Sequence, residues 1–241
     1  MPDPRSLLPI AELAKPRTPT ELAAWVDEKI AAIAEVEDAR EPALMHQGPF
    51  KKFYEEIYPL NLFVKHRYSG RENILITPNP DNRSFDAAVR DGSVSPPLEI
   101  LVEITQAWDP QAHLRMEYFV KHGGVGLWSP VISSGNKRNR KTHVELVAVD
   151  RVEHVRRDCA RIKEAAESKA NRTDHYGPSH VLVIAFDDWW KPSDEDIATL
   201  RAFVIESVLP LQLNFAALYV LGLSGRTYVP FPLTCSRGGD G

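Results

Sequence analysis

Apolar residues recur along this chain in two rhythms, and the change from one to the other separates helical segments from strands. From Leu22 to Ala34 the spacing is three or four positions, which predicts an amphipathic helix that ends near residue 37. Thr18 and Pro19 start it in the usual order, a capping hydroxyl followed by a proline in the first turn. Residues 1–18 contain four prolines and little periodicity, so we expect an arm that packs on the body or stays mobile.

A second helical pattern covers about residues 41–58 with a break at Gly48-Pro49, and a short helix or turn over 60–67 follows Pro59. Next come three runs of aliphatic and β-branched residues, separated by clusters of Pro, Asn, Asp and Gly. This pattern predicts three strands in quick succession. We expect these strands over residues 73–77, 85–89 and 98–105.

Helices and strands alternate in the rest of the chain. Residues 180–186 form an almost unbroken apolar run, which is typical of a strand buried on both faces. The other expected elements are a helix over 109–122, strands over 126–132 and 142–149, a charged helix over 150–170, a helix from Ser193 to 209 and a strand over 217–223.

Three successive strands followed by helix–strand alternation predict an α/β fold with a mixed central sheet flanked by helices. We divide the chain into an N-terminal arm and helix over 1–40, a single α/β domain over 41–235 and a flexible tail over 236–241. The tail and the arm are the parts with the least apolar periodicity.

Composition narrows the class of protein. The chain has 241 residues, of which 43% are apolar, and a formal net charge of −4, which is ordinary for a globular protein. Cys159 and Cys235 lie far apart in unrelated contexts, which argues against a disulfide framework or a zinc motif and fits a reducing compartment. No apolar run approaches the length of a membrane span and the N-terminus lacks the core of a signal peptide, so we expect a cytoplasmic protein without membrane contact.

Two of the expected strands carry one carboxylate each among apolar neighbours, Asp86 and Glu103. A buried carboxylate is costly unless it is paired, hydrogen-bonded or bound to a cation. If the two strands pair, both acids can lie side by side on one face. Such a pair suits Mg²⁺ or Mn²⁺, because hard cations prefer oxygen ligands. The structural alternative is that Asp86 caps a turn or pairs with Arg90, and that Glu103 pairs with Arg115.

The order of helix, three-stranded meander, helix and strand, with an acid on the second and third strands, resembles the PD-(D/E)XK nuclease superfamily. Its motif is Asp, a variable gap, and (Asp/Glu)-x-Lys. Here Asp86, a gap of 16 residues and Glu103-Ile104-Thr105 match it, with Thr105 at the lysine position. The resemblance covers about residues 50–186. It implies a restriction-endonuclease-like core and a nuclease that hydrolyses phosphodiesters with metal-activated water, with Mg²⁺ or Mn²⁺ bound by the two acids.

In that family the lysine positions the attacking water and stabilises charge, which Thr105 cannot do as a cation. Some members draw the cationic group from a neighbouring element. By this resemblance the candidates are Arg115 or Lys121 on the next helix, or Lys65 before the first strand. Glu56, on the preceding helical segment, corresponds to an extra metal-binding acid that some members carry there.

A basic loop between the expected strands of the hairpin is a candidate nucleic-acid contact. Its cations can grip phosphates, with Arg giving bidentate contacts and Lys point charges. The alternative is a solvated hairpin tip, and the negative net charge supplies no global attraction to nucleic acid. The cations are Lys137, Arg138, Arg140 and Lys141.

Two functions outside catalysis stay open. The chain could be an inactive nuclease-like module that binds a protein or a nucleic acid. It could also be an assembly protein, for example a homodimer, whose last apolar strand and Trp189-Trp190 form an interface.

Overall fold

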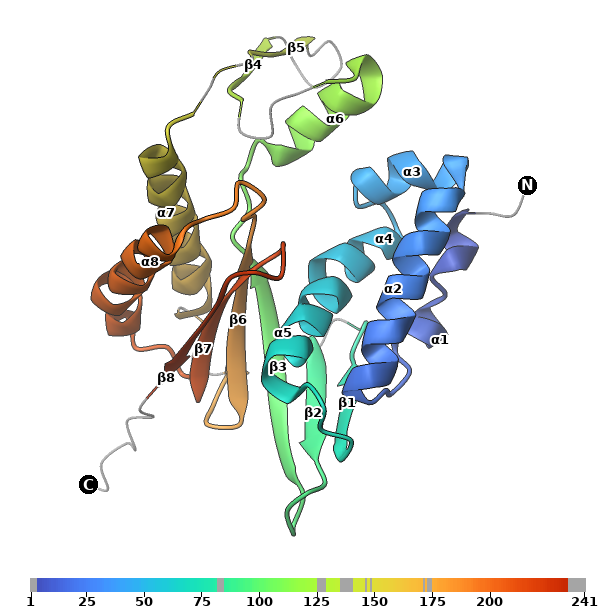
Figure 1. The fold of residues 1–241 in the computed structure, drawn as a ribbon, viewed down its shortest axis with the longest axis vertical. Coiled ribbons are helices and arrows are strands. Elements are labelled where there is room, and N and C mark those ends of the chain that lie inside the picture. Colours follow the sequence, from blue (N-terminus) through green and yellow to red (C-terminus); the bar gives the residue numbers. More distant parts are fainter. Residues whose placement is uncertain are drawn as a thin grey trace.

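The three strands expected in succession form one half of a mixed six-stranded sheet (Figure 1). In the computed structural model the first three strands make an antiparallel meander, β6 and β7 continue parallel to β3, and β8 closes the sheet antiparallel to β7. The predicted α/β class with a mixed sheet flanked by helices is confirmed. The strands are β1 (Ile74–Pro78), β2 (Ala87–Asp91), β3 (Leu98–Gln106), β6 (His180–Phe186), β7 (Ala217–Gly222) and β8 (Tyr228–Pro232).

The structure describes residues 4–81, 85–124, 129–134, 141–145, 147, 149–170, 172 and 175–233, without the side chains of Arg5 and Lys141. Within these ranges no helix is long and apolar enough to cross a membrane. The helices are η1 (Pro4–Leu7), α1 (Ile10–Leu13), α2 (Pro19–Glu35), α3 (Glu37–Leu44), α4 (Pro49–Lys52), η2 (Phe53–Ile57), α5 (Tyr58–Tyr68), α6 (Ala112–His122), α7 (Arg151–Ala170), α8 (Asp194–Ser207) and η4 (Leu209–Leu211).

The sheet separates two apolar layers because side chains alternate across each strand. Val181 and Val183 of β6 join the core under α2 and α5. Leu182 and Ile184 face the opposite way and join the core under α7 and α8. Figure 1 shows the two sets of helices on the two faces. The apolar run of β6 is therefore buried on both faces, as its sequence predicts.

The described part of the N-terminal arm packs on the body. Leu8 and Leu13 are buried in the core, and Arg17 forms an antiparallel bridge with Ile76 on the outer edge of β1. The guanidinium of Arg17 lies 4.0 Å from the centre of the Trp25 ring. Of the two behaviours expected for the arm, packing is the one observed for these residues.

A helix runs without a break from residue 49 to residue 68, although Pro59 predicts a new element there. Its middle, η2, is π-helical. Proline has no N–H, so the carbonyl oxygen of Glu55, four residues earlier, loses its helical donor. The side-chain amide of Gln106 at the end of β3 donates to this oxygen at 2.7 Å. The π-turn therefore accommodates the proline and ties the helix to β3.

The remaining differences from expectation lie after β3 and at the end of the chain. The expected strands over 126–132 and 142–149 correspond to the short pair β4 (Val131–Ser134) and β5 (Lys141–Val144), and residues 125–128, 146 and 148 lie outside the described part. α6 and this pair lie beyond the carboxyl end of β3 (Figure 1). β8 was not expected, because its two prolines argue against a strand. β8 lies at the edge of the sheet, where proline is tolerated.

Candidate active site

The two acids lie at a notch in the sheet, beside the first residue of β2. β2 pairs with β3 only up to Val102, whereas β6 pairs with β3 as far as Gln106. Asp86 comes directly before β2, and its backbone N–H still donates to the carbonyl oxygen of Val102 at 2.8 Å. Its carboxylate Oδ2 accepts the backbone N–H of Ile104 at 2.7 Å. The Asp86 side chain thus takes the place of the missing strand partner.

Glu103 projects from β3 toward α7 and has two partners, one on α7 and one in the segment between α7 and β6. One carboxylate oxygen, Oε1, accepts a hydrogen bond from the ammonium of Lys169 and one from the hydroxyl of Tyr176 at 3.2 Å. The ion pair is largely dry, since the side chains of Lys169 and Glu103 are 13% and 11% exposed. Only part of the carboxylate is satisfied, because within the described residues no donor reaches its second oxygen, Oε2.

The charge of Glu103 acts on the carboxyl group of Asp86. Burial is the main cause that raises the pKa of the Asp86 carboxyl to about 7, and the negative charge of Glu103 is the next. The hydrogen bond from Ile104 and the charge of Lys169 act in the opposite direction. The pKa of the Tyr176 hydroxyl is also raised, first by burial and then by Glu103. Both groups therefore sit in a dry, negatively charged environment.

Glu56, in the π-helical segment η2, brings a third carboxylate to this environment. It is paired with Lys52 at 2.8 Å and 3.1 Å, and its pKa is raised mainly by burial, with Glu103 among the further causes. Three carboxylates, those of Asp86, Glu103 and Glu56, therefore lie near two ammonium groups in the described part of the chain. π-helical turns occur often at functional sites.

The donor set of this notch fits a hard divalent cation bound by two carboxylates. Asp86 and Glu103 each keep one carboxylate oxygen without a hydrogen-bond donor among the described residues, and their repulsion raises the pKa of Asp86. Mg²⁺ usually binds one or two carboxylates and keeps several waters. In the described ranges no group of three or more His, Cys, Asp or Glu side chains is arranged to hold a metal ion, so Glu56 is not a third direct ligand in this geometry.

Lys169 is the cation that sequence reasoning missed. It lies in the last turn of α7, 66 residues from Glu103 in the sequence. Thr105, which stands where the nuclease motif has lysine, shares the face of Glu103 by strand alternation and is partly exposed. A lysine in the last turn of an amphipathic helix is common, so no local signal marked Lys169 as a partner of Glu103.

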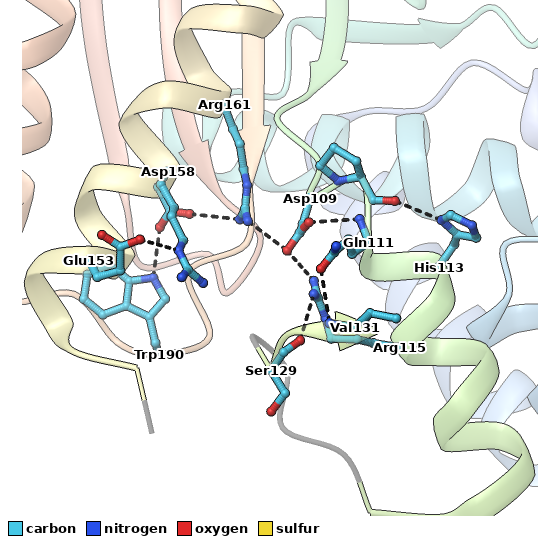
Figure 2. Close-up of polar contacts among 12 residues, drawn as sticks. Asp109, Gln111, His113, Arg115, Ser129, Val131, Glu153, Asp158, Arg161 and Trp190 are labelled. Atoms are coloured by element: carbon cyan, nitrogen blue, oxygen red, sulfur yellow. Dashed lines mark hydrogen bonds and ion pairs between the residues drawn. The ribbon is translucent and has the colours of Figure 1, made fainter. Parts of the chain in front are cut away.

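Arg115 belongs to a different network, shown in Figure 2. Its guanidinium donates to Asp109 at 2.5 Å and to the carbonyl oxygen of Ser129 at 3.3 Å. Asp109 also pairs with Arg161 at 2.8 Å, and Arg161 lies 3.6 Å from Asp158. The expectation that Arg115 serves the acid pair is corrected, because this buried network uses it to join α6 to α7.

Lys121 and Lys65 do not serve the acid pair either. Lys121 donates to Glu117 on the exposed side of α6 at 2.7 Å, and Lys65 lies 3.5 Å from Asp27. The expectation for Lys121 fails because α6 leaves the sheet beyond β3, whereas α7 covers the face that carries Glu103 (Figure 1). The structural pairings considered for the acids, with Arg90 and with Arg115, do not occur among the described residues.

The basic loop lies almost entirely outside the described residues. Lys137, Arg138 and Arg140 are in the part that the structure leaves out, and for Lys141 only the backbone, at the start of β5, is described. Their proposed contact with nucleic acid therefore stays a prediction.

The two tryptophans after β6 differ from each other. The indole N–H of Trp190 donates to Asp158 at 3.0 Å, and its ring stacks on His154. Trp189 is 54% exposed. Trp190 therefore has a structural role. In an interface formed by the two tryptophans, Trp189 would be the exposed contact residue.

A further buried carboxylate, Asp188, is fully paired with donors. It accepts the backbone N–H of Ser224 at 2.6 Å, the hydroxyl of Ser224 at 2.8 Å and that of Thr227 at 2.8 Å. A Cβ atom on Gly222 would lie 2.0 Å from its Oδ2, so the glycine makes room for it. Asp188 therefore joins the β6 and β7 ends of the sheet.

No family model, no curated protein and no solved structure matches this chain. The likeness to the nuclease superfamily therefore stays a prediction. Function has to be argued from the chemistry of the site itself.

Proposed function

We propose that this protein is a divalent-metal-dependent nuclease whose site is the acid pair Asp86 and Glu103 with Lys169 beside it. The observation that carries the proposal is the buried ion pair between Lys169 and Glu103 next to a second carboxylate with a raised pKa. Perturbed carboxylates that a structure holds without full pairing are typical of catalytic sites. Lys169 supplies the positive charge that the motif lacks at Thr105.

Each residue has a role that its contacts support. Asp86 and Glu103 would hold Mg²⁺ or Mn²⁺ through the oxygens that accept no hydrogen bond. A cation bound there polarises the phosphodiester and lowers the pKa of the attacking water. Tyr176 and Lys169 both bind Oε1 of Glu103 and so fix the orientation of that carboxylate. The ammonium of Lys169 has two further N–H donors, which can bind an oxygen of the phosphate as negative charge develops.

The substrate proposed for this site is a nucleic acid, with the basic loop as an additional phosphate contact. Hydrolysis by water forms a bond from the water oxygen to phosphorus and breaks the bond to the departing sugar oxygen. Glu56 would act indirectly: with Lys52 it sets the charge around the notch. The net charge of −4 means that affinity must come from local contacts.

A calorimetric Mn²⁺ titration tests the metal site. We expect wild-type protein to bind Mn²⁺ and Glu103→Gln to lose most of the heat, since the substitution keeps the shape and removes a ligand charge. The matched control is Glu99→Gln, an exposed glutamate on the same strand, which should bind as wild type does. Equal binding by all three proteins would show that the acids are structural.

Hydrolysis is then measured on single-stranded and duplex DNA and on RNA, with Mg²⁺ or Mn²⁺ and with EDTA. We expect cleavage that requires the metal and disappears in Glu103→Gln but not in Glu99→Gln. Metal binding with nucleic-acid binding but no cleavage of any substrate would contradict the nuclease proposal and favour an inactive binding module.

A further inference from the structure

A pocket of about 420 Å³ lies between α3, α4 and α6, beside the carboxyl end of β3. Its size is in the usual range for a small-molecule site. A larger cavity of about 830 Å³ between α7 and α8 touches none of the acid-site residues. The smaller pocket is the one of interest here, because its lining includes Glu55, the neighbour of Glu56, and Trp108, which follows β3.

Aromatic rings form one wall of this pocket. The ring of His46 stacks on Tyr54 with centroids 5.4 Å apart, and the edge of Trp108 contacts His46 at the same centroid distance. Trp108 is 39% exposed and lines the pocket, so part of its side chain is accessible to a ligand there. His46 adopts a φ of 48°, a conformation that is uncommon outside glycine and is often held at functional sites.

The segment η2 connects the pocket to the strand that carries Glu103. The carbonyl oxygen of Glu55 accepts the side-chain amide of Gln106 at 2.7 Å, three residues along β3 from Glu103. At the usual strand rise this is a separation of about 10 Å. Glu55 lines the pocket, while Glu56 is among the charges that act on Asp86. The hydrogen bond from Gln106 thus joins the segment that lines the pocket to the strand that carries Glu103.

The polar groups at the rim suit a base attached to a phosphate chain. Lys51 is 65% exposed in its side chain and offers a cation to a backbone phosphate. Glu55 accepts His46 Nδ1 at 3.2 Å, so the aromatic wall is fixed before a ligand enters. Its carboxylate can also accept the exocyclic amino group of a base. Met45 and Met116 add polarisable apolar surface against which a flat ring can pack.

We propose that this pocket binds an unpaired nucleobase of a single-stranded nucleic acid, next to the phosphodiester at the acid pair. The inference rests on the proposed function and adds the substrate class to it. A base inside a duplex is stacked between its neighbours and cannot enter a side pocket without being flipped out. Stacking on aromatic rings binds bases of any sequence and does not require a net positive charge, which fits a protein whose formal net charge is −4.

The first test is binding without hydrolysis. Fluorescence anisotropy follows a short, mixed-sequence, labelled DNA strand in EDTA at fixed salt, with the corresponding RNA strand and DNA duplex as separate probes. We expect Trp108→Ala to weaken single-strand binding by about tenfold or more, the usual contribution of one stacked base. Trp108→Phe should recover most of the affinity, since it keeps a ring. Trp189→Ala, an exposed tryptophan outside the pocket, should bind as wild type does.

The outcomes separate this inference from the nuclease proposal. Unchanged binding in Trp108→Ala, an equal loss in Trp189→Ala, or tighter binding of the duplex than of the single strand would each overturn the pocket. Glu103→Gln should keep the Trp108-dependent binding in EDTA. If wild-type protein binds no Mn²⁺ and cleaves no substrate while Trp108-dependent binding persists, the base pocket stands and the hydrolytic function fails. If metal-dependent cleavage is observed but Trp108→Ala changes nothing, the reverse holds.

Discussion

Two buried carboxylate sites lie on the same sheet, and they are satisfied in opposite ways. Asp188, beyond β6, accepts three hydrogen bonds from Ser224 and Thr227 and is fully buried. Asp86 accepts one from a backbone N–H, and Glu103 shares one oxygen between two donors. The first site matches its acceptors with donors, whereas at the second one oxygen of each carboxylate accepts no hydrogen bond from the described residues and is not fully buried.

The difference separates a structural acid from a candidate functional one. Buried polar groups are nearly always hydrogen-bonded, because leaving one unpaired is costly. A site that is only partly satisfied is therefore either a strain on the fold or a place where a ligand completes the bonding. The acid pair is a place of the second kind, because a bound cation would give its free carboxylate oxygens a partner. The following predictions test this contrast.

The largest effect is expected from Asp188→Ala. Removing the carboxylate leaves the Ser224 N–H and two hydroxyl groups buried without an acceptor, so we expect the free energy of unfolding to fall by about 3–5 kcal/mol. Urea denaturation measures it. Gly222→Ala should give a similar loss, because the new methyl group collides with Asp188. A loss below about 1 kcal/mol in Asp188→Ala would mean that this site is no better satisfied than the acid pair.

Lys169→Met should have its main effect on catalysis. We expect kcat for metal-dependent hydrolysis to fall by about 100-fold, as for the loss of one charge-stabilising group. Calorimetric Mn²⁺ affinity should be retained or increased, because the site becomes more negative. Lys163→Met, on the exposed part of the same helix, is the control. Loss of Mn²⁺ binding together with unfolding would indicate that Lys169 only holds Glu103 in place.

Asp86→Asn should stabilise the metal-free protein at high pH. The folded-state pKa of about 7 lies above the unfolded value of about 4, so the folded protein binds more protons between these limits. Wild-type stability therefore falls as pH rises from about 4 to about 7, and the cost is fully present above 7. Asparagine cannot ionise, so we expect Asp86→Asn to be more stable than wild type by up to about 4 kcal/mol at pH 8.

The comparison for Asp86→Asn is a pair of urea titrations at about pH 5 and pH 8 in EDTA. The advantage of the variant should shrink at the lower pH, and Mn²⁺ should restore wild-type stability at the higher pH but not that of the variant. An advantage independent of pH would contradict the raised pKa.

The smallest effect is expected when the lysine is moved from position 169 to position 105. Adding Thr105→Lys to Lys169→Met should recover about tenfold in kcat, roughly 1.4 kcal/mol, because residue 105 shares the face of Glu103. The recovery should be partial, since an ammonium at position 105 lacks the partner geometry of Lys169. Thr105→Lys alone should change kcat little. No recovery in the double variant, with folding intact, would show that the cation must come from α7.

Much of the fold followed from local pattern. The strand β6 begins and ends where its apolar run predicts, and α2 starts with the Thr18 cap and the first-turn proline that the sequence predicts. The meeting of Asp86 and Glu103 also followed, because alternation and a meander place them on one face. These features depend on residues close in sequence or on adjacent strands.

What local pattern could not supply was the identity of distant partners. Pro59 predicted a break in the helix, but a π-turn and the amide of Gln106 accommodate it. Arg115 was expected beside the acids because it follows β3 closely, yet Asp109 takes its guanidinium. In both cases the outcome depends on which groups the packed layers bring within hydrogen-bond distance.

The sequence by itself determined the α/β class and most of the strands, because burial periodicity and capping are local properties of the chain. Only the tertiary structure decided that Lys169 pairs with Glu103 and that Trp108 and His46 line one pocket. The physical reason is that the apolar stripe of α7 packs on the face of the sheet formed by β6 and β7, and this packing brings the lysine at the end of the helix to the acid on the neighbouring strand β3.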